Sequence, residues 1–195
     1  PVTLSSGHYA TVHVKAASSN YKNWFTDRWS QVVKALGVPV YQVGELGEDL
    51  VDGADHSFVG AHINESIALI ANASFHMGID SFPMHLTHYT WLGTHRGAAE
   101  KVPSLILWGS TQATAAGYSH NVNISLGLPC QPCFILDPKM YHRNFGHGGP
   151  CKHPPLQVYT EPKHECMTGI SVEMVIKEAL ALQTRTCESP LITLV

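Results

Sequence analysis

The chain has 195 residues, of which 44% are hydrophobic, and its formal net charge is −3 at pH 7. This length and composition suit one sizeable folded domain, and the charge excludes an overall attraction to nucleic acid or to an anionic membrane. No apolar run approaches the length of a membrane span, and no signal-peptide pattern is visible at the start. We therefore expect a soluble, cytoplasmic protein.

The first part of the chain predicts a strand, a helix and a second strand. Polar and apolar side chains alternate over residues 9–16, as in a half-buried strand. A helix is expected over 26–37, capped by its first residue, and a strand over 38–43 follows it. Residues 44–53 are rich in glycine and acidic side chains and predict a loop. Lys22 lies in a polar loop between the first strand and the helix, where it could meet a phosphate, although an ordinary surface lysine fits the same pattern.

The middle of the chain is organised around Asp80. Residues 64–73 predict a well-buried helix, and residues 75–79 predict a strand that ends at Asp80. Ser81-Phe82-Pro83 then indicates a helix start, with Ser81 as the N-cap. Such a junction forms a ligand crevice in an open α/β sheet, because helix amides favour phosphate or carboxylate there. Asp80 has the wrong sign for phosphate but can accept hydrogen bonds from sugar hydroxyls; the simpler alternative is that it only caps the helix.

Two further elements complete an alternation of strands and helices. An apolar strand is expected over 102–108, and Gly109-Ser110-Thr111 forms a second junction of the same style. A last helix should run from its N-cap Ser171 to Gln183, with one apolar stripe that packs on the core. The alternation predicts an α/β fold with a parallel sheet covered by helices on both faces.

A cysteine-rich region separates the sheet-forming part from the last helix. Cys130 and Cys133 form a Cys-x-x-Cys pair, and Cys151 and Cys166 follow after a stretch rich in Gly, Pro and His. Four thiolates in this order could bind zinc or iron, and the binding energy would fold the loop. A redox pair, disulfides, a nucleic-acid ribbon and replacement of one thiolate by a loop histidine remain open alternatives. We expect Cys187 to lie outside the site.

Five segments resemble motifs of the family 9 glycosyltransferases, the ADP-heptose:lipopolysaccharide heptosyltransferases and their relatives. They follow one another along the chain in the same order as in that family. Asp80-Ser81-Phe82-Pro83-Met84-His85-Leu86 is similar to the family's Asp-Ser/Thr-Gly-x-x-His-Leu signature, with Phe82 in place of the usual glycine. The other four are Lys22-Asn23-Trp24, the helix over 65–73, Leu107-Trp108-Gly109-Ser110-Thr111, and the cysteine segment that ends at 166–171. In the autotransporter heptosyltransferase branch such a cysteine segment is an iron-binding finger.

The resemblance implies the C-terminal, donor-binding half of a GT-B enzyme. Residues 1–128 would form a Rossmann-like nucleotide-sugar domain, residues 129–168 a metal-binding insertion, and residues 169–195 a helix packed on the same domain. The chain would bind a nucleotide-diphosphate sugar and support glycosyl transfer to an acceptor.

The site residues can be carried over from the resemblance. Lys22 would neutralise the donor diphosphate as the sugar-to-phosphate bond breaks, and Asp80 would hold sugar hydroxyls; these two are the catalytic candidates. The amides of Ser81, Phe82 and Met84 would face the phosphates. His85 would orient Asp80 or touch the donor, and Glu45 would lie near the ribose or base.

Cofactors and partners follow from the same resemblance. No catalytic metal is expected, and structural zinc or iron would be held by Cys130, Cys133, Cys151 and Cys166. The donor could be an ADP-sugar, and the acceptor a glycan or a protein. An N-terminal GT-B domain or a partner chain would supply the acceptor site and base, and homo-oligomers are compatible with the pattern. The rival interpretations are a non-catalytic, metal-stabilised interaction or assembly module and a GT-B epimerase.

Overall fold

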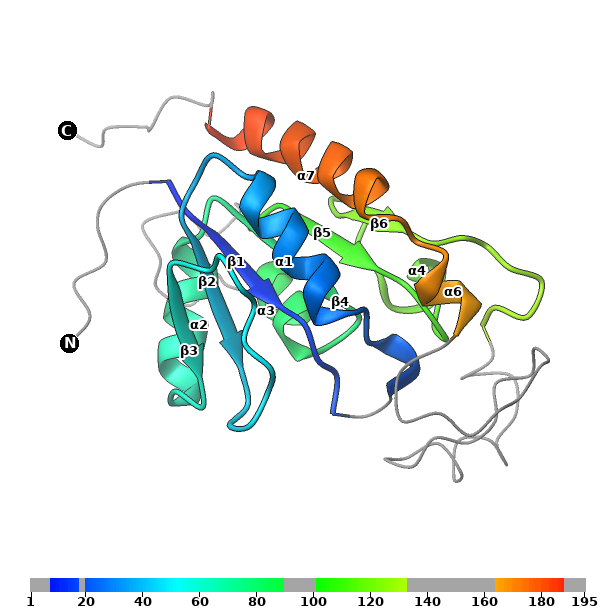
Figure 1. The fold of residues 1–195 in the computed structure, drawn as a ribbon, viewed down its shortest axis with the longest axis horizontal. Coiled ribbons are helices and arrows are strands. Elements are labelled where there is room, and N and C mark those ends of the chain that lie inside the picture. The colour runs from blue at the N-terminus through cyan, green and yellow to red at the C-terminus, as the bar shows by residue number, and fades with distance from the viewer. Residues whose placement is uncertain (1–7, 18–19, 90–100, 133–163, 188–195) are drawn as a thin grey trace.

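The computed structural model describes residues 8–17, 20–89, 101–132 and 164–187, which contain one six-stranded parallel sheet (Figure 1). The strands are β1 (Ala10–His13), β2 (Val40–Gly44), β3 (His56–Val59), β4 (Phe75–Ile79), β5 (Ser104–Leu107) and β6 (Val122–Ile124). They lie side by side in the order β3-β2-β1-β4-β5-β6. The predicted parallel α/β sheet is confirmed. The order reverses between β1 and β4, which is where open α/β sheets bind ligands.

Helices cover both faces of the sheet. The helical segments are η1 (Asn20–Lys22), α1 (Thr26–Ala35), α2 (Ile63–Asn72), α3 (Phe82–Tyr89), α4 (Ala113–Ala116), α6 (Glu165–Thr168) and α7 (Val172–Cys187). Figure 1 shows α1 and α7 together on one face, with α2 and α3 on the opposite face. Within the described ranges no helix has both the length and the apolar character needed to cross a membrane.

The core is built by the alternation of side chains along the strands. Phe75 and Met77 of β4 point to the face of α1 and α7, where they pack in one buried cluster with Trp29 and Val175. His76, between them, points to the other face and is also fully buried. Central strands of a parallel sheet are covered on both sides, so β4 reads as an almost continuous apolar run.

Two smaller clusters fill the second face. One joins Leu69 and Ile70 of α2 to Tyr41 of β2, and the other joins Met84 of α3 to Ile106 and Trp108. These contacts fix the start of α3 above the end of β4. The direction of α3, and hence of Asp80 and Ser81 at its start, is set by this packing.

Several elements differ from the sequence-based expectations. Strands β3 and β6 and the short helix α4 were not predicted. Helix α2 is less buried than expected, because only Leu69, Ile70 and Ala71 are buried and its first turn is exposed. The N-cap of α1 is Phe25 rather than Thr26. The apolar stripe predicted for the last helix included Leu180, but this side chain is exposed on α7.

Candidate functional site

Polar side chains converge at the carboxyl ends of β1, β2, β4 and β5. The residues come from five places in the chain: His13 ends β1, Lys22 ends η1, Glu48 follows β2, Asp80 follows β4, and Thr111 follows β5. All five lie within covered surroundings, since even the long side chains of Lys22 and Glu48 are largely shielded from solvent. The site therefore occupies the point where the strand order reverses.

Lys22, Asp80 and Thr111 form the centre of this site. The Lys22 Nζ atom lies 2.8 Å from Asp80 Oδ2, and the exposed fractions of the two side chains are 11% and 7%. The Thr111 hydroxyl donates to the same Oδ2 atom at 2.6 Å. Breaking a buried ion pair leaves a charge without compensation, which makes such a pair structurally demanding. Both contacts fall on one carboxylate oxygen, so Oδ1 of Asp80 is the oxygen left for a further donor.

The backbone before Lys22 is held by local contacts. The Asn23 side-chain oxygen accepts a hydrogen bond from the Ala16 amide at 2.7 Å and closes the loop that leads from β1 to η1. Gly109, at the end of β5, allows the Tyr21 carbonyl to approach closely, because a Cβ atom at this position would overlap that oxygen and Met167. These contacts bring the lysine over the end of β4.

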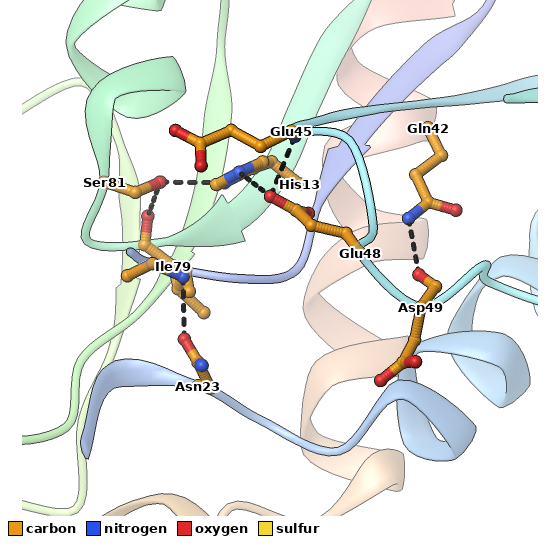
Figure 2. A network of polar contacts seen from close by, with 9 residues as sticks. His13, Asn23, Gln42, Glu45, Glu48, Asp49, Ile79 and Ser81 are labelled. Atoms are coloured by element: carbon orange, nitrogen blue, oxygen red, sulfur yellow. Dashed lines mark hydrogen bonds and ion pairs between the residues drawn. The ribbon is translucent and has the colours of Figure 1, made fainter. Parts of the chain in front are cut away.

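A second polar network links β1, the loop after β2, and the start of α3 (Figure 2). His13 Nδ1 lies 2.9 Å from the Ser81 hydroxyl oxygen, and His13 Nε2 lies 3.7 Å from Glu48 Oε1. The Ser81 hydroxyl also donates to the Ile79 carbonyl at 3.2 Å. The imidazole therefore connects a carboxylate on one side to a helix-start hydroxyl on the other.

Glu48 is held over the end of β2. Its Oε1 atom accepts a hydrogen bond from the Glu45 amide at 2.9 Å. Its Oε2 atom is buried and has no hydrogen-bond partner among the described residues. A Cβ atom at Gly44 would overlap this carboxylate, so glycine there makes room for it. A buried acceptor without a partner is costly.

The predicted donor-binding residues lie at the same edge of the sheet, but they differ in whether their polar groups already make contacts within the protein. The Ser81 hydroxyl contacts His13 and Ile79. The Met84 amide donates to the Ser81 carbonyl at 3.1 Å, and the Met84 side chain is buried, so this amide already serves the first turn of α3. Phe82 and Glu45 are exposed. Binding of a phosphate by the amides of Ser81, Phe82 and Met84, and of a nucleoside by Glu45, stays a prediction.

His85 belongs to an aromatic cluster on the flank of α3. Its Nδ1 atom lies 2.8 Å from the Tyr118 hydroxyl oxygen, and His88 stacks on the Tyr118 ring with centroids 3.9 Å apart. Burial, followed by the hydrogen bond and charge of Tyr89, raises the pKa of Tyr118 to about 12. The described contacts of the His85 side chain are thus with Tyr118, and its predicted role toward Asp80 or the donor is not tested by them.

Two of the four predicted metal-ligand cysteines lie in the described ranges. Cys166 is buried in α6, and Cys130 is half-buried in a turn where Gln131 donates to the Gly109 carbonyl at 2.5 Å. Cys133 and Cys151 lie outside the described residues. Among the residues that are described, no group of three or more metal-binding side chains occurs. The four-cysteine finger therefore stays a prediction.

Sequence reasoning missed His13 and Glu48. His13 has the alternation of a strand residue, and Glu48 lies in a segment that resembles an ordinary acidic loop. Position gave a partial signal for Glu48, which lies in the loop after the strand predicted over 38–43, because the carboxyl ends of parallel strands meet at one edge of the sheet. His13 lies inside the strand predicted over 9–16, so the sequence did not indicate that β1 ends there.

These features define a Rossmann-like α/β domain with a buried charged site at its switch point. No protein-family model matches the sequence, and no curated protein is similar enough to match it.

Solved structures of family 9 glycosyltransferases are similar in fold. One is a dodecameric, iron-containing heptosyltransferase TibC in complex with ADP-D-β-D-heptose: it has 19% identity, a TM-score of 0.65, and coverage of 98% of this chain and 49% of its own. The E. coli ADP-heptose lipopolysaccharide heptosyltransferase II is 15% identical with a TM-score of 0.61, and the match covers 94% of this chain and 49% of that enzyme. A family 9 glycosyltransferase from Veillonella parvula is 16% identical with a TM-score of 0.61, and the match covers 94% of this chain and 48% of that protein. The resemblance found in the sequence is thereby confirmed at the level of the fold.

The chain spans about half the length of these structures.

Proposed function

We propose that this domain binds the nucleotide diphosphate of an activated sugar and supports transfer of the sugar to an acceptor. The observation that carries the proposal is the buried Lys22–Asp80–Thr111 group at the switch point of a glycosyltransferase-like fold. A buried ion pair contributes little net stability compared with apolar packing. Its position at the ligand-binding edge of the sheet favours a role in binding and chemistry.

Lys22 is the group proposed to stabilise the leaving nucleoside diphosphate. An ammonium has three donors, so Lys22 can keep its contact with Asp80 and also donate to a phosphate oxygen. As the bond between the sugar and the diphosphate breaks, negative charge grows on the diphosphate, and a nearby cation in covered surroundings lowers the barrier. Asp80 would hold Lys22 in place through Oδ2 and accept a sugar hydroxyl at Oδ1.

The start of α3 is proposed as the second part of the diphosphate site. Ser81 and Phe82 stand at the N-terminus of an eight-residue helix, where amides and the helix dipole favour an anion. Glu45 and Glu48 follow β2, which lies two strands away from β4 in the sheet. These carboxylates suit the hydroxyls of a ribose rather than a phosphate, so we propose the nucleoside on that side.

The acceptor site and the general base are proposed to come from elsewhere, either another domain of a longer protein or a partner chain. The partial coverage of the solved structures supports this division. Because TibC is described as dodecameric, self-association of this chain is a further proposal, testable by light scattering coupled to gel filtration.

A structural iron or zinc ion held by Cys130, Cys133, Cys151 and Cys166 is also proposed. The support is the description of TibC as iron-containing, together with the presence of Cys130 in a turn and of the buried Cys166 in α6. Thiolates suit both metals. Elemental analysis of purified protein should give about one metal per chain or a two-iron equivalent, and Cys166→Ser should lower it; metal-free protein of unchanged stability contradicts the proposal.

The test of donor binding is calorimetric titration with ADP-glucose, with UDP-glucose and GDP-mannose in parallel. We expect a dissociation constant in the micromolar range for one nucleotide sugar and at least a tenfold loss in Lys22→Met. Lys34→Met is the matched control, since it also removes the lysine of a Lys–Asp pair but lies on the exposed side of α1. Equal effects of the two substitutions, or no binding of any nucleotide sugar by folded protein, would refute the proposed function.

A further inference from the structure

The charge at the start of α3 is not supplied by Lys22 alone. Lys22 is paired with Asp80 at 2.8 Å, so the two charges largely cancel before any ligand arrives. Glu48 adds a covered carboxylate nearby, and Glu45 adds an exposed one. A site intended for a diphosphate, which carries at least two negative charges, therefore needs another cation. His13 is a further side chain of this site that can carry a positive charge.

Both ring nitrogens of His13 face groups that can accept a proton-mediated contact. Ser81 has one hydroxyl proton, which it donates to the Ile79 carbonyl, so the Ser81 oxygen needs a donor from His13 Nδ1. On the other side, His13 Nε2 lies 3.7 Å from a carboxylate oxygen of Glu48, which is beyond hydrogen-bond distance but close enough for an imidazolium and a carboxylate to attract each other. Only the imidazolium form supplies a proton on both nitrogens.

The surroundings of His13 contain few competing groups. Glu48 and Glu45 face it from the loop after β2, Ser81 from the start of α3, and His76 from β4; the Lys22–Asp80 pair lies at the end of the neighbouring strand. His76 does not take the proton, because complete burial, followed by the charge of His13, lowers its pKa to about 3. The side chain of His13 is only 7% exposed, so a charge on it is poorly screened.

We propose that His13 takes up a proton when a diphosphate binds at the start of α3, and that the imidazolium then orients the Ser81 hydroxyl toward the phosphate. With Nδ1 protonated, His13 donates to the Ser81 oxygen, and the Ser81 proton is free to turn from the Ile79 carbonyl to a phosphate oxygen. A neutral His13 that lacks the Nδ1 proton would instead accept the Ser81 proton and point it away. His13 is thus a positioning residue, and the inference rests on the proposed diphosphate site.

Proton uptake on binding can be measured directly. Titrations with ADP-glucose are made at pH 7.5 in phosphate and in Tris buffer, whose ionisation enthalpies differ, so the difference in binding heat gives the number of protons taken up. ADP-glucose is chosen because its diphosphate has no terminal phosphate that titrates near pH 6. We expect uptake of a clear fraction of one proton, and an affinity that falls between pH 6 and 8 by up to about tenfold per pH unit.

His13→Asn is the decisive variant. Its side-chain amide can still reach Ser81 from the position of Nδ1 but cannot titrate. Proton uptake should fall to about zero, and the affinity should become independent of pH, while binding itself remains. If His13→Asn does not fold, the ring carbon shifts of His13, followed by NMR in the native protein with and without ADP-glucose, replace it.

The outcomes separate the two proposals. Absence of binding at every pH overturns the proposed function and the inference with it. Binding without proton uptake, or uptake that persists unchanged in His13→Asn, overturns only the role of His13. Proton uptake that is lost in this variant supports it.

Discussion

The domain contains two lysine–aspartate pairs that have the same chemistry and different surroundings. Lys22 and Asp80 have side chains that are 11% and 7% exposed, whereas Lys34 and Asp52 are 55% and 79% exposed. The first pair joins η1 to the end of β4, and the second joins α1 to the loop after β2. Solvent screens the second pair and leaves each partner hydrated, so each tolerates loss of the other.

The two pairs differ in how much the surrounding structure depends on them. Lys22 shares Asp80 with a third group, Thr111, and neither charge can regain full hydration if its partner is removed. Packing of this kind holds a cation and an acceptor in fixed places at the ligand-binding edge. The Lys34–Asp52 pair lies on the exposed surface, away from the ligand-binding edge.

The largest effect is expected for Lys22→Met. The substitution leaves the Asp80 carboxylate buried without a counter-charge, and loss of one partner of a buried pair costs about 3–5 kcal/mol of unfolding free energy. Urea denaturation followed by circular dichroism measures it. The double variant Lys22→Met/Asp80→Asn should recover a substantial part, because no lone charge remains. A double variant no more stable than the single one would argue against a charge-pairing role.

A smaller loss is expected for Thr111→Val, which keeps the side-chain shape and removes the hydroxyl that donates to Asp80 Oδ2. Hydrogen bonds to charged groups contribute about 1.5–3 kcal/mol, so the unfolding free energy should fall by about 2 kcal/mol. Thr111→Ser retains the donor and serves as the control. A loss in Thr111→Ser with none in Thr111→Val would show that the methyl group, rather than the hydroxyl, stabilises the fold.

His76 extends this comparison, because it is fully buried and its contacts among the described residues include no opposite charge. Burial, followed by the charge of His13, lowers its pKa from 6.5 to about 3. Between these values the unfolded chain binds a proton that the folded chain does not, so stability rises with pH in this window and is lost as the pH falls below about 6.5. From pH 7 to pH 5 this histidine should remove about 2 kcal/mol of unfolding free energy.

The measurement for His76 is the difference between native protein and His76→Gln, because the chain has thirteen histidines that all contribute to the raw pH profile. His76→Gln is neutral throughout, and its stability should vary less between pH 7 and 5. Profiles that run parallel would show that His76 is protonated in the folded state.

Features that depend on neighbouring residues along the chain could be predicted from the sequence. The strand over 75–79 was predicted with the bounds of β4, and Asp80 with the proline of the next helix marks its C-terminal end. The Ser171 cap is confirmed by its hydroxyl, which accepts a hydrogen bond from the Met174 amide at 3.3 Å. In both cases the decisive residues are neighbours along the chain.

The parts that were missed depend on tertiary pairing. Strand β3 has two exposed polar residues among four and is a strand because it pairs with β2 at the sheet edge. The contact of His13 with Ser81 joins positions 68 residues apart, and the pairing of Lys22 with Asp80 likewise brings distant segments together. Sequence reasoning named Lys22, Asp80 and Ser81 separately, but only the fold reveals that the first two are partners.

The smallest effect is expected for Lys34→Met, at the exposed pair. Lys34 holds the pKa of the Asp52 carboxyl below its ordinary value, first by its hydrogen bond and then by its charge. Removing the lysine should therefore raise the pKa of Asp52 toward that ordinary value, as measured by NMR titration, and leave the urea midpoint within experimental error. High salt should raise the same pKa in the native protein, because exposed pairs are screened. A loss of stability comparable to that of Lys22→Met would mean that burial is not what separates the two pairs.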